Sequence, residues 1–594
     1  GAILMIEFAR ETIEELNSNC EKLTEDFKSQ KLGYHYPLVK GPDIKKVWAL
    51  RKAGLGVLSN MPGDARPVSV IEDTSVNPKV LESYIKDFNI ILDKYKLQCV
   101  YHAHISVGEL HLRPILDLKK EKDVEMFHTI AQETAHLVKK YRGSLSGEHG
   151  DGRLRGEFIP LMVGEEIFSW FKDIKKTWDP HNVFNANKIT DTPKMNTMLR
   201  YEPGNDTPEI ETIFDFSKQG GYMRAIEKCN GSGDCRKTEL IGGAMCPSYM
   251  ASRDEYTTTR ARANILREYI SNSRNGDFWN QKEIYDVLDL CLSCKACKSE
   301  CPSSVDMAKL KAEFLQHYYD KNGIPLRSRA IAYITSFNSL GSILPGIYNF
   351  FISNKFVSGI FKRSLGFAVE RSIPVLGKTT LHKWARKNLD TLNKLQHAGA
   401  KEVVLFIDEF TNFNDVEAGI KTMKLLSALG YKLVVPKAVE SGRTFISKGL
   451  IRTAKKKATK NIRIFKEFVK DGTPLVGVEP SAILSFRDEY PELAENEDLE
   501  DANKLAKNAF LLEEFLLDEI RKGNIKKEMF TKEKRKLKFH GHCQQKAIAS
   551  TAVSIECLTF PENYEAQEIP SGCCGMAGSF GYEKEHYELS QKVG

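Results

Sequence analysis

Four cysteines in the middle of the sequence have the spacing that an iron–sulfur cluster requires. Cys291, Cys294, Cys297 and Cys301 follow the pattern C-x2-C-x2-C-x3-C, and Pro302 comes directly after the last of them. Thiolates at these intervals can wrap one face of a cubane while the fourth reaches a neighbouring cluster. The spacing therefore predicts iron–sulfur chemistry, and zinc is the alternative that such thiolates leave open.

A second group of cysteines lies upstream of the first. It comprises Cys229, Cys235 and Cys246, and Ser232 stands where a further cysteine would complete the first spacing. This group is the natural partner of the first, because two-cluster arrays exchange their last ligands. The alternative is that Cys229 and Cys235 are structural thiols.

The exchange of ligands divides the seven cysteines between two sites. A complete 4Fe–4S site would have the ligands Cys246, Cys291, Cys294 and Cys297. The second site would have three thiolates, from Cys229, Cys235 and Cys301. We expect that site to hold either a 3Fe–4S cluster or a 4Fe–4S cluster with Ser232 or another oxygen ligand.

Composition supports a reducing compartment and argues against a nucleic-acid partner. The chain has 594 residues, 13 cysteines and a net charge of +7. Tight grouping of cysteines indicates metal or cluster ligation rather than disulfides, which favours a cytoplasmic protein. The lone thiols Cys20, Cys99 and Cys557 are interpreted as packed side chains. The small positive charge, without a basic segment that carries aromatic residues, excludes nucleic-acid binding.

Two short stretches in the first third of the chain are rich in histidine and acidic residues. Residues 102–111 read HAHISVGELH, and residues 146–152 read SGEHGDG. Alternation along a strand would place His102, His104 and Ser106 on one face. Two imidazoles and a carboxylate can bind a divalent metal and leave positions open for a substrate.

These stretches resemble two motifs in the C-terminal half of FAD-linked oxidases of the vanillyl-alcohol-oxidase fold. The segment around Cys229–Lys237, Met245–Tyr249 and Thr259–Asn264 resembles the dicluster segment of FAD-linked D-lactate and glycolate dehydrogenases. The resemblance covers nearly the whole chain. It implies FAD as a cofactor, held mainly by a domain that would precede residue 1, so we expect the chain alone to be inactive.

The resemblance also implies roles for individual residues. His104, His111 and Glu148 would bind a divalent metal, zinc or manganese, and His149 would act as the catalytic base. Two arginines are candidates for holding the substrate carboxylate, Arg51 and Arg66, although either could be a solvated side chain.

One departure bears on these roles. Many relatives have Gly-Asp-Gly-Asn before the last histidine, where this chain has Ser-Val-Gly-Glu at residues 106–109. The alternative is that the histidines are packed or surface side chains without a metal.

The end of the chain carries a third group of thiols. Residues 571–581 read SGCCGMAGSFG and resemble the cysteine-rich CCG module of heterodisulfide reductase and anaerobic glycerol-3-phosphate dehydrogenase subunits. The resemblance implies Cys543, Cys573 and Cys574 as ligands of a metal or cluster. The first half of the module has lost its cysteines, because residues 440–443 read ESGR here, and Gln544 replaces the usual histidine.

The pattern of elements predicts an α+β and α/β multidomain protein. Residues 1–190 mix strands, among them Ile3–Phe8, Val68–Ile71 and Cys99–Ile105, with helices at Pro78–Lys94 and Lys122–Tyr141. We expect this segment to be the C-terminal half of a vanillyl-alcohol-oxidase-type flavoenzyme. A linker over 191–222, a helical dicluster ferredoxin domain over 223–320 and a helical connector over 321–395 would follow. Residues 400–594 would form a truncated α/β cysteine-rich domain, with βαβ order from Glu402 onward.

Residues 330–354 in the connector carry no formal charge, which raises the question of a membrane. Pro345 and the frequent polar residues make the stretch too interrupted for a spanning helix. We favour helices packed between domains. The alternative is an interfacial segment that makes peripheral contact with the inner face of the membrane.

Together these features predict an enzyme that oxidises a D-2-hydroxy acid to the 2-oxo acid. The expected substrate is D-lactate, with glycolate and D-2-hydroxyglutarate as alternatives, and electrons would pass through the clusters to a quinone or another carrier. The competing interpretation is a non-catalytic iron–sulfur subunit that works with a separate flavoprotein. The histidine motifs favour the enzyme, because a pure electron carrier does not need them.

Overall fold

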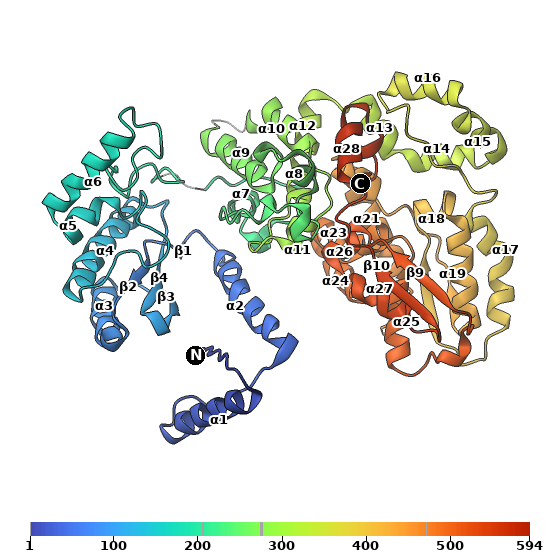
Figure 1. The fold of residues 1–594 in the computed structure, drawn as a ribbon. Helices are drawn as coiled ribbons and strands as arrows, with labels where there is room; N and C mark the ends of the chain where they lie inside the picture. The colour runs from blue at the N-terminus through green and yellow to red at the C-terminus, as the bar shows by residue number, and fades with distance from the viewer. Residues whose placement is uncertain (1, 205–206, 274–276, 471) are drawn as a thin grey trace. The chain divides into compact units, whose positions relative to one another are not determined.

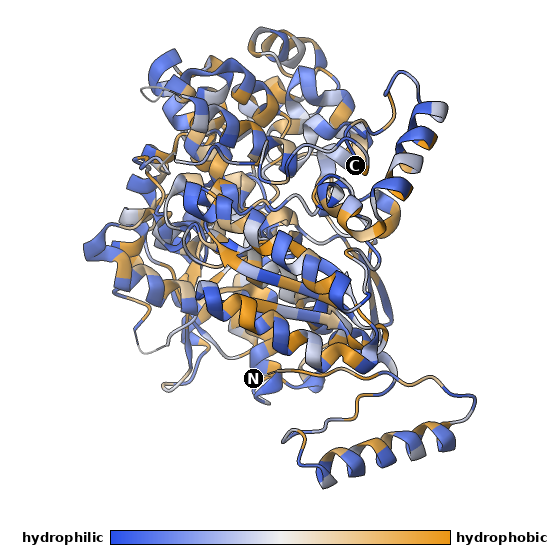
Figure 2. Ribbon diagram, turned by 90° about the vertical axis from the view of Figure 1, so that its left-hand side faces the viewer, coloured by the Kyte–Doolittle hydropathy of each residue, from blue (hydrophilic) through white to orange (hydrophobic). Residues whose placement is uncertain are grey.

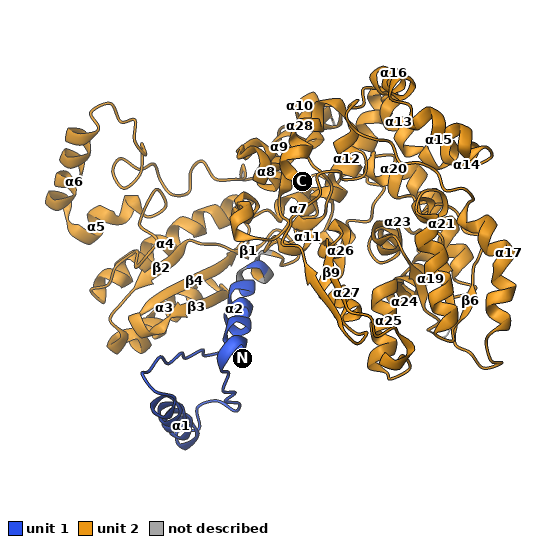
Figure 3. Cartoon of the chain, turned by 45° about the vertical axis from the view of Figure 1, so that its right-hand side comes forward, with its two compact units in different colours: residues 1–57 blue, residues 58–594 orange. Residues whose placement is uncertain are grey.

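The computed structural model describes residues 2–204, 207–273, 277–470 and 472–594. The chain divides into two compact units, residues 1–57 and residues 58–594 (Figure 3). It is a mixed α/β protein in which helices predominate. Hydrophobic residues run along the strands and along one side of many helices (Figure 2).

The first unit contains two long helices, α1 (Ile13–Ser29) and α2 (Ile44–Ser59), the second of which continues to residue 59. Thr12 caps α1 by accepting a hydrogen bond from the backbone N–H of Glu15. The expected strand over Ile3–Phe8 is wrong, because these residues form no strand. Its apolar side chains Ile3, Leu4 and Ile6 are exposed.

The second unit begins with an antiparallel sheet covered on one face by two helices (Figure 1). Its strands are β1 (Arg66–Pro67), β2 (Ile71–Ser75), β3 (Cys99–His104) and β4 (Glu109–Leu116), and β4 pairs with the other three. The helices α3 (Leu81–Tyr95) and α4 (Glu121–Lys140) match the two expected helical runs closely. The strand expected at Val68–Ile71 begins only at Ile71.

Alternation along β4 separates the core from the functional face. Leu110 and Leu112 are buried in a cluster that includes Phe88 of α3 and Ile130 of α4. Glu109 and His111, at the alternate positions, therefore lie on the other face of the sheet.

A helical segment follows and contains seven of the cysteines. Its helices are α7 (Tyr222–Glu227), α8 (Pro247–Ser252), α9 (Thr259–Asn272), α10 (Lys282–Asp289), α11 (Ala296–Glu300) and α12 (Met307–Asn322). The connector then forms α13 (Leu326–Ala332), α14 (Ile334–Gly341), α15 (Pro345–Ser353), α16 (Lys355–Leu365) and α17 (Leu381–Lys394). None of the helices in the described ranges is both long and apolar enough to cross a membrane.

The α/β part has a parallel sheet in the order β6-β5-β7-β8. Its strands are β5 (Glu402–Phe406), β6 (Lys432–Val434), β7 (Leu475–Gly477) and β8 (Ala509–Leu511). The crossover between β5 and β6 contains α19 (Val416–Ala428), which confirms the expected βαβ unit. Further along the chain, β9 (Arg535–Phe539) pairs with β10 (Tyr564–Glu568) in a separate parallel sheet.

The helical segment and the α/β part share one core, and a buried ion-pair network also joins them. A single buried cluster extends from Phe214 to Leu511. Lys295 lies between Cys294 and Cys297 in the sequence and is 2% exposed. It donates to the carboxylates of Asp488 and Glu489. The loop that carries Cys294 and Cys297 is therefore fastened to the domain that follows it, while the domain boundaries given above stay a prediction.

We predict that Lys295→Met destabilises the protein by about 3 kcal/mol, because it leaves buried carboxylates with less compensation. The matched control is Lys282→Met, since Lys282 pairs with Asp286 on the exposed surface and such a pair contributes less than about 1 kcal/mol. Urea unfolding followed by tryptophan fluorescence measures both. Equal shifts of the two midpoints would contradict a structural role for the buried network.

Candidate functional site

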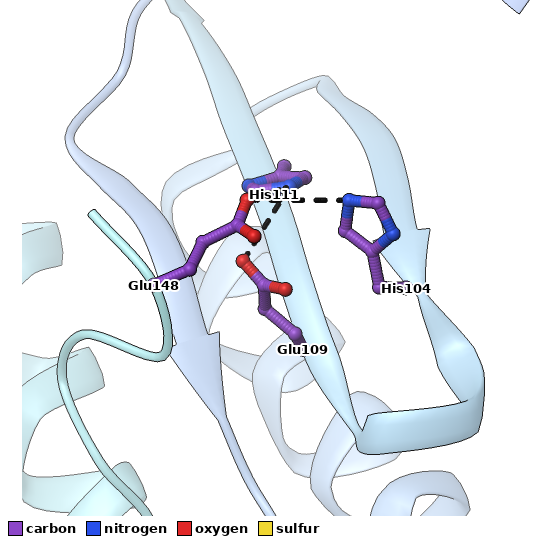
Figure 4. A group of neighbouring side chains, drawn as sticks. All are labelled: His104, Glu109, His111 and Glu148. Atoms are coloured by element: carbon purple, nitrogen blue, oxygen red, sulfur yellow. Dashed lines mark ion pairs between the residues drawn. The ribbon is translucent and has the colours of Figure 1, made fainter.

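The two histidine-rich stretches meet on the open face of the antiparallel sheet (Figure 4). In the register of β3 and β4, His104 lies opposite Glu109 and His102 lies opposite His111. Glu148, from the loop after α4, reaches the same place. Its Oε1 lies 3.8 Å from His111 Nε2 and 4.0 Å from His104 Nε2.

Glu109 joins this group, although sequence reasoning noted it only as a departure from the family motif. Its Oε1 lies 3.6 Å from His111 Nε2. One ligand atom from each of His104, Glu109, His111 and Glu148 lies within 4.8 Å of the others. The structure thus brings together the three expected metal ligands and adds a fourth side chain, a carboxylate.

Two buried polar atoms in this group have no hydrogen-bond partner among the described residues, Glu109 Oε1 and His111 Nδ1. Burial, with the nearby Asp73 and Glu148, raises the pKa of Glu109 to about 7. Burial also lowers the pKa of His111, in spite of the neighbouring carboxylates. An unsatisfied buried carboxylate oxygen is costly, and a divalent cation among the four side chains would satisfy Glu109 Oε1. His111 would bind it through Nε2, the ring nitrogen that faces Glu109 and Glu148, whereas its Nδ1 lies 3.9 Å from Glu72 Oε1. The four side chains therefore fit a divalent metal.

Asp73 positions the loop that carries Glu148 and His149. It sits at a bulge in β2 with φ of +83°, a conformation that is strained for a residue other than glycine. Its carboxylate, fully buried, accepts the backbone N–H of Glu148 at 2.8 Å and of His149 at 2.9 Å, and also the hydroxyl of Ser146. Burial opposes ionisation, but these hydrogen bonds lower the pKa of Asp73 to about 2. No sequence motif indicated this role, because it depends on the bulge.

His149 lies beside the candidate metal ligands rather than among the buried residues. Its Nε2 is 3.0 Å from Glu148 Oε1, and its ring centroid is 5.5 Å from that of His111. The side chain is 49% exposed, which leaves it open to a substrate. An accessible imidazole held beside a carboxylate is the arrangement that a histidine general base requires.

The two candidate arginines have different positions in the chain. Arg66 pairs with Leu116 at the end of β4, five residues from His111, which corresponds to about 17 Å along the strand. The structure therefore does not bring Arg66 to the histidine group. Arg51 belongs to the first unit, so its role as a carboxylate anchor stays a prediction.

The cysteines of the complete cluster site line one enclosed pocket. Cys246, Cys291, Cys294 and Cys297 all border it, together with Arg262. Arg262 is fully buried, and its guanidinium donates to Cys246 Sγ at 3.5 Å and to Ser248 Oγ at 3.2 Å. Burial alone would lower the pKa of Arg262, but the surrounding thiolates raise it. A buried guanidinium beside four thiols fits an anionic iron–sulfur cluster, and it was not expected from the sequence.

The remaining three cysteines of the array also lie near one another. Burial is the main cause that raises the pKa of Cys229, and the charge of Cys301 adds to it. Burial likewise raises the pKa of Cys235 to about 11, and Cys229 and Cys246 contribute. Ser232 is exposed. The grouping is consistent with a site of three thiolates, while its fourth ligand stays open.

The C-terminal thiols lie next to the complete cluster site. Cys543 Sγ is 3.6 Å from Cys573 Sγ. Hydrogen bonds with Cys543 and Cys574 raise the pKa of Cys573, and the charges of Cys543 and Cys294 raise it further. Gln544 donates to the backbone carbonyl of Ser293 at 3.2 Å. The hydrogen bond from Cys573 lowers the pKa of Cys574. Metal binding by the three thiols stays a prediction.

Residues 440–443, where the resemblance to the cysteine-rich module predicts lost ligands, take part in buried polar contacts. Ser441 donates its backbone N–H and its hydroxyl to Glu409 at 2.8 and 2.7 Å, and Arg443 forms an ion pair with Glu489. These side chains fill the place with hydrogen bonds instead of sulfur ligands.

We predict that Cys294→Ala removes one cluster, about four iron atoms per chain, because Cys294 borders the enclosed pocket. The matched control Ser232→Ala should retain that cluster. Anaerobic reconstitution, followed by iron and sulfide analysis and electron paramagnetic resonance, measures both. A colourless protein that contains only zinc would refute the iron–sulfur assignment.

We also predict that His111→Ala abolishes binding of a divalent metal and that Glu109→Gln weakens it by about 10–100-fold. His128→Ala is the control, since His128 pairs with Glu157 at 3.3 Å outside the group. Elemental analysis and titration with zinc or manganese measure metal content, and cluster absorbance shows whether the fold is intact. An unchanged metal content in His111→Ala would show that the group is not a metal site.

Two segments match known domain families. Residues 1–189 match the family described as FAD linked oxidases, C-terminal domain, and residues 225–305 match the 4Fe-4S dicluster domain. These matches support FAD and iron–sulfur clusters as cofactors, and they coincide with the two sites described above.

The chain is also similar to complete proteins. It is 28% identical to D-2-hydroxyglutarate dehydrogenase of Escherichia coli (strain K12), over 97% of this chain and 59% of that protein. The enzyme of the same name from Haemophilus influenzae is 27% identical over 93% of this chain and 57% of its own length. One of the subunits of the anaerobic glycerol-3-phosphate dehydrogenase of Escherichia coli (strain K12) is 27% identical over 46% of this chain and 68% of its own length. The chain thus spans less than two thirds of the dehydrogenases that it resembles along nearly its whole length. It contains one segment that matches the C-terminal domain of FAD linked oxidases and one that matches the 4Fe-4S dicluster domain.

Proposed function

We propose that the protein oxidises a D-2-hydroxy acid to the 2-oxo acid and passes the electrons through its iron–sulfur clusters to a quinone or another carrier. The observation that supports this most strongly is the convergence of His104, Glu109, His111 and Glu148 beside the exposed His149. An electron carrier without a substrate has no use for such a group.

The cofactors and the protein contribute different parts of the chemistry. When bound, FAD supplies a hydride acceptor, a divalent metal supplies a Lewis acid, and the clusters supply one-electron carriers. The imidazole of His149 accepts the proton of the substrate hydroxyl. Glu148, 3.0 Å from Nε2, stabilises the imidazolium that forms.

The protein also holds the reacting groups in place. Asp73 fixes the backbone of Glu148 and His149, and Arg155 braces the same loop by donating to the carbonyl of Gly150 at 2.6 Å. A general base must stay within hydrogen-bond reach of its proton, so this bracing preserves the geometry on which proton transfer depends.

For the substrate, D-2-hydroxyglutarate is the best-supported choice, because it is the substrate in the name of the relatives that align along nearly the whole chain. The expectation of D-lactate came from a resemblance to a broader family, and D-lactate and glycolate are the competitors to test. D-2-hydroxyglutarate has a second carboxylate, which would require a further cationic side chain, whereas D-lactate and glycolate would not.

The second candidate function is an iron–sulfur subunit that receives electrons from a separate flavoprotein. It is favoured by the similarity to the anaerobic glycerol-3-phosphate dehydrogenase protein, which covers 46% of this chain. That similarity does not extend to the other half of the chain. Residues 1–189 match a FAD-linked oxidase domain, which a pure electron carrier does not need.

We predict that His149→Ala slows reduction of the flavin by D-2-hydroxyglutarate by about two to four orders of magnitude, the usual contribution of a general base. The experiment uses FAD-loaded protein, including any sequence that precedes residue 1. Rapid mixing with D-2-hydroxyglutarate, D-lactate or glycolate follows flavin bleaching apart from the clusters.

The control for this experiment is His128→Ala, which should bleach at the normal rate. Near-normal bleaching in His149→Ala would show that His149 is not the base. Faster bleaching by D-lactate than by D-2-hydroxyglutarate would overturn the choice of substrate while leaving the reaction class intact.

A further inference from the structure

Three helices of the connector have their apolar side chains on the outside. Figures 1 and 3 show α14, α15 and α16 together at the margin of the second unit. Phe356 is 77% exposed, Leu340 74% and Ile343 73%, and Phe350, Leu344 and Ile360 are each more than half exposed. Isolated exposed apolar residues are normal, but so many within one short segment of the chain indicate an interaction surface.

The same helices bury polar side chains instead. Asn338 of α14 and Ser358 and Lys362 of α16 are buried, whereas α15, the most apolar of the three, buries none of its residues. This arrangement is the reverse of a helix that packs against a protein core. The interpretation that the connector is packed between domains does not account for it.

Polar contacts hold the helices in this orientation. Asn349 of α15 donates to the carbonyl of Leu376 and accepts the N–H of the same residue, both at 2.8 Å. The Lys362 ammonium donates to the carbonyl of Val369 at 3.3 Å. The inward face is therefore fastened by hydrogen bonds, and the apolar face is directed away from the protein.

The charge of the surrounding segment identifies the partner. Residues 321–369 contain no aspartate or glutamate. They contain six cationic residues, Lys321, Arg327, Arg329, Lys355, Lys362 and Arg363. Lys362 is buried and Arg327 pairs with Glu583 and Glu585, so neither is counted toward the charge of the surface. Lys355 and Arg363 are exposed on α16, beside the apolar group. Exposed apolar side chains with cations and no acids are typical of a surface that lies on an anionic membrane.

We propose that α14, α15 and α16 form a docking surface for the headgroup region of an anionic lipid bilayer, which they enter from one side without crossing it. The apolar side chains would lie among the upper acyl chains, and Lys355 and Arg363 would lie among the phosphates. Binding to an acidic partner protein would not account for the many exposed phenylalanine and leucine side chains on these helices. This inference does not depend on the hydroxy acid chemistry.

The test is flotation of the full chain with vesicles, one set of phosphatidylglycerol and phosphatidylethanolamine and one of phosphatidylcholine alone. We expect binding to the anionic vesicles, weaker binding to phosphatidylcholine, and a loss of binding as salt is raised. Leu340→Glu combined with Phe350→Glu should weaken binding roughly tenfold or more, because two exposed apolar side chains that would enter the bilayer are replaced by anions.

The matched control is Leu395→Glu, since Leu395 is also 74% exposed but lies outside the three helices. It should bind vesicles as the unmodified protein does. Equal loss in the control, or no binding to anionic vesicles by the unmodified protein, would overturn the proposal. A concentration-dependent dimer that Leu340→Glu dissociates, without vesicle binding, would assign the surface to a second copy instead and would equally refute it. Cluster absorbance in each variant confirms that the fold is retained.

Discussion

The helical segment depends on burying thiolates together with the cation that neutralises them. Arg262 of α9 is fully buried, and its partners are Cys246 Sγ, Ser248 Oγ and the carbonyl of Val287. A buried guanidinium without a compensating anion is costly. The thiolates of an iron–sulfur cluster would supply that anion. Helices α8, α9 and α10 all contribute atoms to the surroundings of the guanidinium. Folding of the segment and insertion of its cluster are therefore expected to depend on each other.

Charged contacts connect the cluster segment to the parts on either side of it. Towards the sheet, Asp64 accepts from Arg224 at 2.9 and 2.6 Å and from Lys119 at 3.1 Å, and these cations lower the pKa of Asp64 despite its burial. Towards the α/β part, Lys295 binds two carboxylates. Both connections lie within the second unit, and each one joins segments that follow one another along the chain.

Local patterns in the sequence predicted the parts of the fold that depend on few residues. The cysteine spacing, the strand at Cys99–His104 and the βαβ unit at Glu402 follow from short stretches. The contributions of Glu109 and Asp73 could not be predicted, since they depend on the register of β2 with β4 and on a bulge within it. The sequence left two alternatives for the connector, packing between domains and contact with a membrane, because hydrophobicity alone does not tell a core from an interface.

The central claim is that electrons from a hydroxy acid reach the clusters of this protein. The most direct measurement is anaerobic mixing of D-2-hydroxyglutarate with FAD-loaded protein, frozen at intervals for electron paramagnetic resonance. The account predicts that the flavin bleaches first and that the signal of a reduced 4Fe–4S cluster then grows without any added reductant. A reduced flavin beside clusters that only dithionite can reduce would contradict it.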